Sequence, residues 1–166
     1  MNFQFYIEKL HSSEEFEKFR KENPNAYFCS AFISVDKEGK DNKIHLDYFN
    51  PENKKGFSFQ LEDGIKLSDL ENFGEGSPME ISEEIDFNLE QVESLILEKM
   101  EKENIKNKIQ KILLSLQDFD GKTVLSATVF ISMMGILKFT ISLPEIKIED
   151  FQKKSFFDMV NVLKKS

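Results

Sequence analysis

Apolar and polar residues alternate along several stretches of the chain, and this period of two is typical of half-buried β-strands. Three such stretches follow one another in the first half, at residues 27–35, 43–49 and 57–61. The segments between them, Asp36–Lys40 and Asn50–Gly56, are rich in residues that favour turns. The pattern therefore predicts an antiparallel meander.

The N-terminus combines a short alternating stretch with a helical one. Residues 3–7 alternate, which predicts a first strand. Ser12 follows with a hydroxyl that is able to cap a helix, and Glu15 is placed to complete a capping box. A helix is therefore predicted from this cap to about Glu22, where Asn23–Pro24 ends it.

Residues 72–84 contain glycines, a proline and several acids, and they are predicted to form a loop. A second amphipathic helix is predicted after this loop, with either Asp86 or Asn88 as its N-cap. Its far side is charged, and its apolar residues recur at spacings of three and four: Leu89, Val92, Ile96 and Met100.

Residues 108–116 fit two patterns, because their apolar residues match either a continued helix or a strand. A comparison of the two halves of the chain favours the strand. The matched segments are Phe32–Lys40 with Leu114–Lys122, and Phe57–Leu61 with Phe139–Leu143. Between these segments, alignment of Ile44, Leu46 and Tyr48 with Leu125, Ala127 and Val129 requires a shift of one residue. We therefore expect a strand at Ile112–Gln117 and a tandem duplication.

The stretch Val124–Leu143 is long and apolar enough to suggest a membrane span as one alternative. Serines, threonines and a lysine alternate with its apolar residues, which favours a β-hairpin that turns at Met133–Gly135. From Ile148 the spacing predicts a last helix, with its apolar stripe at Phe156, Met159, Val160 and Leu163.

The predicted fold class is α+β, with antiparallel β-meanders packed by helices in the order β-α-β-β-β-α-β-β-β-α. A tandem duplication of an α-β-β-β unit is part of this prediction. Residues 1–73 form the first α+β half, residues 74–86 form a loop and residues 87–166 form the second half. Both halves are expected within one compact domain, since 166 residues fit a single domain.

The composition indicates a folded, acidic chain with a core rich in phenylalanine. Hydrophobic residues make up 40% and charged residues 31%, and there are 17 Phe and no Trp. The formal charge of −8 repels phosphate backbones and anionic lipids. We therefore expect neither nucleic acid nor membrane as a partner. A local basic face remains as an alternative to a solvated helix face, at Lys153, Lys154, Lys164 and Lys165.

The single cysteine, Cys29, excludes an intramolecular disulfide and a cysteine-based zinc site. It lies in an apolar strand-like run and is predicted to be a buried structural residue. The N-terminal residues lack the pattern of a signal peptide. These observations predict a cytoplasmic location.

No motif for catalysis, cofactor binding or metal binding emerges, so we predict no catalytic, cofactor-binding or metal-binding residues and no cofactor. His11 and His45 are interpreted as solvated or hydrogen-bonded surface residues. The acids of two turns, Asp36, Glu38 and Asp41 and in the second half Asp118 and Asp120, are interpreted as hairpin chemistry, because the spacing of a calcium loop fails. No glycine-rich phosphate loop is present.

Three features follow one another in the second half: the apolar run Lys111–Gln117, the turn Asp120–Lys122 and the Val124–Leu143 hairpin. On these features the second half resembles PepSY-like and cystatin-like modules, in which a helix lies across a short antiparallel sheet. Leu143–Ile146 departs from the family's glycine-containing turn. Size, acidity and element order also resemble those of bacterial secretion chaperones. These resemblances imply a non-catalytic module that binds or inhibits other proteins.

The predicted function is therefore a non-catalytic protein-binding module, as an adaptor, inhibitor or secretion-type chaperone. A small-ligand-binding protein and an enzyme without a recognisable sequence signature are the alternatives. The expected partner is another protein, and a homodimer is left open.

Overall fold

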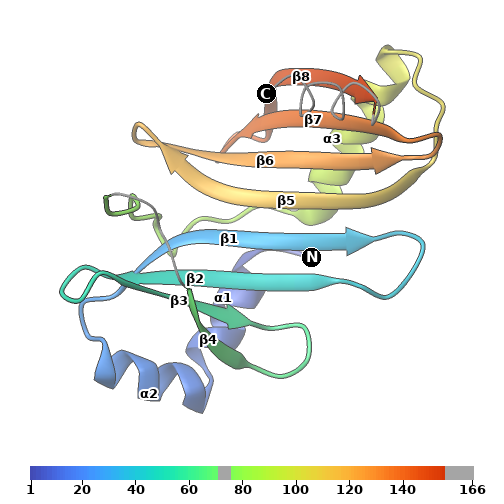
Figure 1. The fold of residues 1–166 in the computed structure, drawn as a ribbon. Helices are drawn as coiled ribbons and strands as arrows, with labels where there is room; N and C mark the ends of the chain where they lie inside the picture. The colour runs from blue at the N-terminus through green and yellow to red at the C-terminus, as the bar shows by residue number, and fades with distance from the viewer. Residues whose placement is uncertain (71–75, 156–166) are drawn as a thin grey trace, which may run out of the picture.

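The structure is a computed structural model that describes residues 1–70 and 76–155 (Figure 1). Three helices and eight strands lie in this part of the chain. The helices are α1 (Gln4–His11), α2 (Glu14–Glu22) and α3 (Leu89–Lys102). The strands are β1 (Tyr27–Asp36), β2 (Lys43–Asn50), β3 (Lys55–Gln60), β4 (Lys66–Leu70), β5 (Ile109–Phe119), β6 (Lys122–Ile131), β7 (Gly135–Ser142) and β8 (Lys147–Ser155). The fold class is α+β, as predicted.

All eight strands form one antiparallel sheet in the order β4-β3-β2-β1-β5-β6-β7-β8. Each half of the chain contributes a four-stranded meander, and the first strand of each meander lies at the centre. There β1 pairs with β5, with Ile33 opposite Leu114 and Phe32 opposite Ser115. The two halves therefore share one continuous sheet (Figure 1).

The three helices pack on the same face of this sheet and enclose one hydrophobic core (Figure 1). In the first half the core is aromatic, as the composition predicts. Phe16 and Phe19 of α2 contact Tyr48 and Phe59 of the sheet, with ring centroids 5.0–5.8 Å apart. In the second half α3 buries aliphatic residues, among them Val92 and Ile96.

The predicted N-terminal strand is wrong, because these residues form α1. Phe3, Ile7 and Leu10 are buried at spacings of four and three, whereas Phe5 is 51% exposed. A stretch as short as residues 3–7 is compatible with both the strand period of two and the helical period of 3.6, and the structure has the helix. The cap of the next helix also differs by one residue, since Ser13 accepts the hydrogen bond from the Phe16 backbone N–H.

Two strands were missed, β4 and β8. Strand β4 is exposed along most of its length, so it lacks an apolar face that would reveal it. The helix predicted from Ile148 is wrong for the described residues, which form β8. A register shift leaves Glu149 as an extra residue, so Ile148 and Phe151 both face the core although they are three residues apart. This spacing resembles that of a helix.

The predicted stripe at Phe156, Met159, Val160 and Leu163 lies outside the described residues. The observed element order is therefore α-α-β-β-β-β-α-β-β-β-β over the part that the structure describes. None of the helices in this part is both long enough and apolar enough to cross a membrane.

Several predictions are confirmed. Residues 108–116 contribute to strand β5, and Val124–Leu143 contains the β6–β7 hairpin. Asn88 caps α3 and accepts hydrogen bonds from two backbone N–H groups of the first turn. The matching of Phe32 with Leu114 needs correction, since Leu114 belongs to the core beneath the helices and Phe32 does not.

Candidate functional site

The face of the sheet opposite the helices carries two rows of side chains across its centre. We call this surface the open face. The cross-strand register of the first row is Phe32, Ser115, Ser126, Thr140 and Asp150. The register of the second row is Ser34, Leu113, Thr128, Lys138 and Gln152. None of these residues belongs to the core under the helices.

Small hydroxyl residues dominate the open face. Ser115, Ser126, Thr128 and Thr140 are all half-buried, because they stand between neighbouring strands. Hydroxyl groups both donate and accept hydrogen bonds, so such a surface is suited to polar contacts with a partner. Activation of a hydroxyl for catalysis requires an adjacent base. No histidine is hydrogen-bonded to a hydroxyl of the open face among the described residues.

Asp47 carries a half-buried carboxylate on the same side of the sheet. Ser30 donates a hydrogen bond from Oγ to Asp47 Oδ2 over 2.7 Å. Burial raises the pKa of Asp47, and hydrogen bonds from Ser30 and Ser58 offset only part of this effect. The open face therefore has one carboxyl group that holds its proton more readily than an exposed aspartate.

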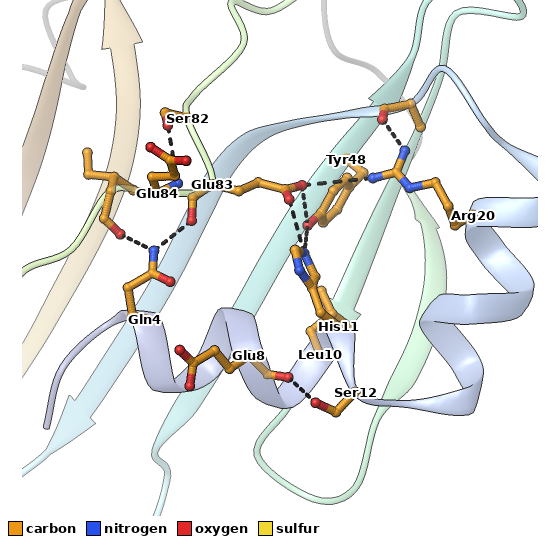
Figure 2. Close-up of polar contacts among 12 residues, drawn as sticks. Gln4, Glu8, Leu10, His11, Ser12, Arg20, Tyr48, Ser82, Glu83 and Glu84 are labelled. Atoms are coloured by element: carbon orange, nitrogen blue, oxygen red, sulfur yellow. Dashed lines mark hydrogen bonds and ion pairs between the residues drawn. The ribbon is translucent and has the colours of Figure 1, made fainter.

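A separate polar cluster lies between α1, α2 and the segment that precedes α3 (Figure 2). Its centre is the carboxylate of Glu83. Tyr48 Oη donates to Glu83 Oε1 over 3.0 Å, and His11 Nε2 lies 3.1 Å from Glu83 Oε2. Arg20 adds a cation at 3.8 Å. Figure 2 shows that these three side chains converge on Glu83 from the helices and the sheet.

The backbone around Glu83 is also held by α1. Gln4 Nε2 donates to the carbonyl oxygens of Glu83 and Ile85, over 2.6 and 2.8 Å. The backbone N–H of Gln4 donates to Asp86 Oδ1 over 3.1 Å. Gln4 of α1 thus holds the segment from Glu83 to Asp86 by both its backbone and its side chain (Figure 2).

The electrostatics of the cluster favour an ionised Glu83. The hydrogen bond from His11 lowers the pKa of Glu83 most, burial opposes it, and Tyr48 and Arg20 lower it further. The pKa of Tyr48 is raised, first by burial and then by the negative charge of Glu83. Tyr48 is fully buried, so its hydroxyl depends on this acceptor. We interpret the cluster as a clamp that holds residues 82–86 against the helices.

The histidines are hydrogen-bonded, as predicted, but each has a carboxylate partner that the sequence did not reveal. His11 contacts Glu83, and His45 Nε2 lies 3.3 Å from Glu62 Oε1. The partners are far apart along the chain, and no local motif marks them.

Cys29 is buried, as predicted, and burial raises the pKa of its thiol to about 12. The acids of the turns also behave as predicted. Asp36 accepts hydrogen bonds from the backbone N–H groups of Glu38, Gly39 and Asp41. Asp118 accepts one from Gly121 in the second half. No three His, Cys, Asp or Glu residues gather into a metal-binding group within the described parts of the chain.

Comparison with known proteins gives a likeness in fold alone. No family model and no curated protein matches the chain. A solved structure with a similar fold is that of a putative lipoprotein from Clostridium difficile 630. It superposes with a TM-score of 0.56 over 85% of this chain and 91% of the other, at 8% sequence identity.

Proposed function

We propose that this chain is a non-catalytic protein-binding module and that its partner contacts the open face. The observation that carries the proposal is the arrangement of the three helices on one side of the sheet, which leaves the row from Phe32 to Thr140 free of described helices. A protein partner that lies across several strands would meet one aromatic ring and a series of hydroxyls.

The physical character of the open face supports a binding role over a catalytic one. Catalysis requires charged or activated groups that converge on a reacting atom. The hydroxyls of the open face stand in rows about one strand spacing apart, roughly 4.8 Å, and therefore spread across the surface. The resemblance of the second half to PepSY-like and cystatin-like modules, and of the whole chain to secretion chaperones, favours an inhibitor, adaptor or chaperone.

We also propose that the two meanders descend from a duplicated unit. The pairing registers relate core residues of the two halves, with one bulge in β1 between Phe28 and Ser30 and with Phe139 shifted by two residues from the match to Phe57 that the sequence suggests. Related positions are Ala31 with Leu114, Ile33 with Leu116, Leu46 with Ala127, Tyr48 with Val129 and Phe59 with Phe139. Under this relation the open face is built from two similar surfaces that meet at the β1–β5 pair, which favours an extended partner.

A small apolar ligand is the second candidate, because a hollow of about 210 Å³ lies between α1 and α3 on the helical side. Its lining includes Tyr6, Val35, Leu89, Ile112 and Leu114. Enrichment of one small molecule by the purified protein, and loss of that enrichment in Leu114→Phe, would favour this candidate over a protein partner.

The proposal is tested by site-specific photocrosslinking in cells that express the chain. A photoreactive amino acid at Ser126 on the open face is expected to form a discrete adduct with a protein partner. The same amino acid at Ser94, an exposed position of α3, is the matched control and should give no such adduct.

The partner identified in this way is then purified and its affinity measured by calorimetry. Ser126→Arg/Thr140→Arg places two bulky cations on the open face and is expected to weaken binding at least about tenfold. The control Gln91→Arg/Ser94→Arg places the same charges on α3 and should bind like the unaltered protein. Equal binding by both variants would contradict the assignment of the open face.

A further inference from the structure

The β6–β7 hairpin ends in two exposed methionines that the packing of the fold does not require. Met133 is 88% exposed and Met134 is 52% exposed. Both have positive φ angles, 66° and 60°, in a region that glycine and asparagine enter more easily than methionine. The tip therefore exposes apolar side chains to water and holds them in a backbone conformation that methionine rarely adopts. Such local conflicts are typical of functional positions.

Apolar surface continues from this tip onto the adjoining strands. Met134 lines a shallow hollow of about 110 Å³ together with Phe130, Ile131, Gly135 and Ile136. Phe130 and Ile136 are opposite each other in the β6–β7 register and lie outside the core under the helices. The feature is an exposed apolar hairpin end beside a shallow hollow, and its most exposed residue is Met133 in the turn.

The strand ends around the tip are basic in a chain that is acidic overall. Lys108 adjoins the tip directly, because its backbone N–H donates to Ser132 Oγ over 3.0 Å and its carbonyl accepts from the Ser132 N–H over 2.8 Å. Lys154 pairs with Ile136, and Lys153 pairs with Leu137. The segments 105–111, 130–138 and 152–155 contain six lysines and no carboxylate side chain.

Five of these six lysines carry charge that the described residues do not neutralise. The ion pairs among the described residues include none of Lys106, Lys108, Lys138, Lys153 and Lys154. The carboxylates of Asp36 and Asp41, in the acidic turn between β1 and β2, already have partners of their own. Asp41 pairs with Lys43 and Lys111, and Asp36 binds backbone N–H groups of its own turn.

We propose that the β6–β7 tip docks on an anionic lipid bilayer, with Met133 and Met134 inserted at the boundary of headgroups and acyl chains. Lys108, Lys153 and Lys154 contact the lipid phosphates. Apolar residues flanked by lysines are the combination that holds proteins at such surfaces. A bilayer accepts an exposed apolar turn of any shape, whereas a protein partner would have to supply a fitted pocket.

The net charge of −8 does not prevent this contact. Charges are screened over about 8 Å at physiological ionic strength, so the lysines nearest the bilayer dominate. The expectation of no membrane contact rested on the charge of the whole chain, and the structure shows that the charge is distributed unevenly.

The test is cosedimentation of the protein with vesicles of phosphatidylcholine and phosphatidylglycerol, and with vesicles of phosphatidylcholine alone. Binding is expected to the mixed vesicles only and to decrease with added salt. The variant Met133→Asn/Met134→Gly places residues that favour positive φ at the tip, so it should fold at least as stably and lose binding. Met79→Ser, which removes another methionine with 55% exposure, is the matched control and should bind normally.

A second pair of variants distinguishes the effect of the lysines near the tip from the effect of the net charge of the protein. Lys108→Gln/Lys153→Gln/Lys154→Gln is expected to weaken binding at least about tenfold, because each lysine near an anionic surface contributes roughly a fivefold effect. Lys18→Gln/Lys122→Gln/Lys147→Gln changes the net charge equally and should have little effect. The proposal is overturned if the unaltered protein binds neither vesicle, which leaves an acidic protein surface as the occupant of the tip. Equal binding by the two lysine variants also overturns it.

Discussion

Replacement of Glu83 by glutamine removes the charge at the centre of the clamp while it keeps the size of the side chain. Tyr48 and His11 then hydrogen-bond to a neutral amide, at sites now 3.0 and 3.1 Å from the carboxylate. Hydrogen bonds to a charged group contribute about 1.5–3 kcal/mol and neutral ones about 0.5–1.5 kcal/mol. Because the Glu83 side chain is 32% exposed, water compensates part of the loss. We expect Glu83→Gln to lower the free energy of unfolding by about 1–2 kcal/mol.

The measurement is urea unfolding followed by circular dichroism, with a double-mutant cycle. Tyr48→Phe removes the buried donor, and the coupling energy between the two substitutions should be about 1 kcal/mol. Glu84→Gln is the matched control, since it removes a neighbouring exposed charge and should change stability by less than about 0.5 kcal/mol. The reasoning is refuted if Glu83→Gln and Glu84→Gln unfold at the same urea concentration, or if the cycle shows no coupling.

The pKa of Glu83 adds a pH dependence with a defined sign. Its value in the folded protein is lowered from the ordinary 4.5. A lowered pKa contributes stability that is fully present above the unfolded value and is lost as pH falls through the folded value. The stability difference between the unaltered protein and Glu83→Gln should therefore shrink as pH falls below the ordinary pKa of 4.5. A difference that grows as pH falls below this value would contradict the hydrogen-bonded carboxylate.

Three further predictions concern the packing. Cys29 should react with a disulfide reagent at neutral pH only after denaturant is added, because burial raises the pKa of its thiol to about 12; rapid labelling of the native protein would contradict this. Gly135→Ala should cost about 1–2 kcal/mol in unfolding experiments, since the new Cβ would lie 2.7 Å from Ile131, and Ile131→Val should recover part of it. Phe59→Ala should cost about 3–5 kcal/mol, because this ring is fully buried; a loss below about 1 kcal/mol would disprove its place in the core.

The strands that could be predicted from the sequence are those with one face in the core and one outside it. In β6 and β7 the burial alternates almost perfectly, so the sequence alternates as well. Strand β4 forms the edge of the sheet and is exposed on nearly every residue, so no alternation arises. In β8 the extra residue Glu149 breaks the period of two. Exposure and bulges therefore account for the two missed strands.

The clamp could not be predicted for a different reason. His11 and Glu83 are separated by most of the first half of the chain, and neither lies in a motif that points to the other. Their proximity results from the way α1 and α2 pack over β2, which depends on the aromatic contacts of Phe16 and Tyr48. Local patterns specify elements, whereas such pairs arise only from the packing of elements.

The chemistry of the open face bears on how firmly a partner would bind there. Hydrophobic burial contributes roughly 25 cal/mol for each Å² of apolar surface, so rows of Ser and Thr supply little of it. Their hydrogen bonds replace bonds to water and add about 1 kcal/mol each at most. Phe32 and Leu113 are the main apolar residues of the two rows. A partner is therefore expected to gain affinity near the β1–β5 pair and specificity from the hydroxyls on β6 and β7, a combination that favours reversible binding.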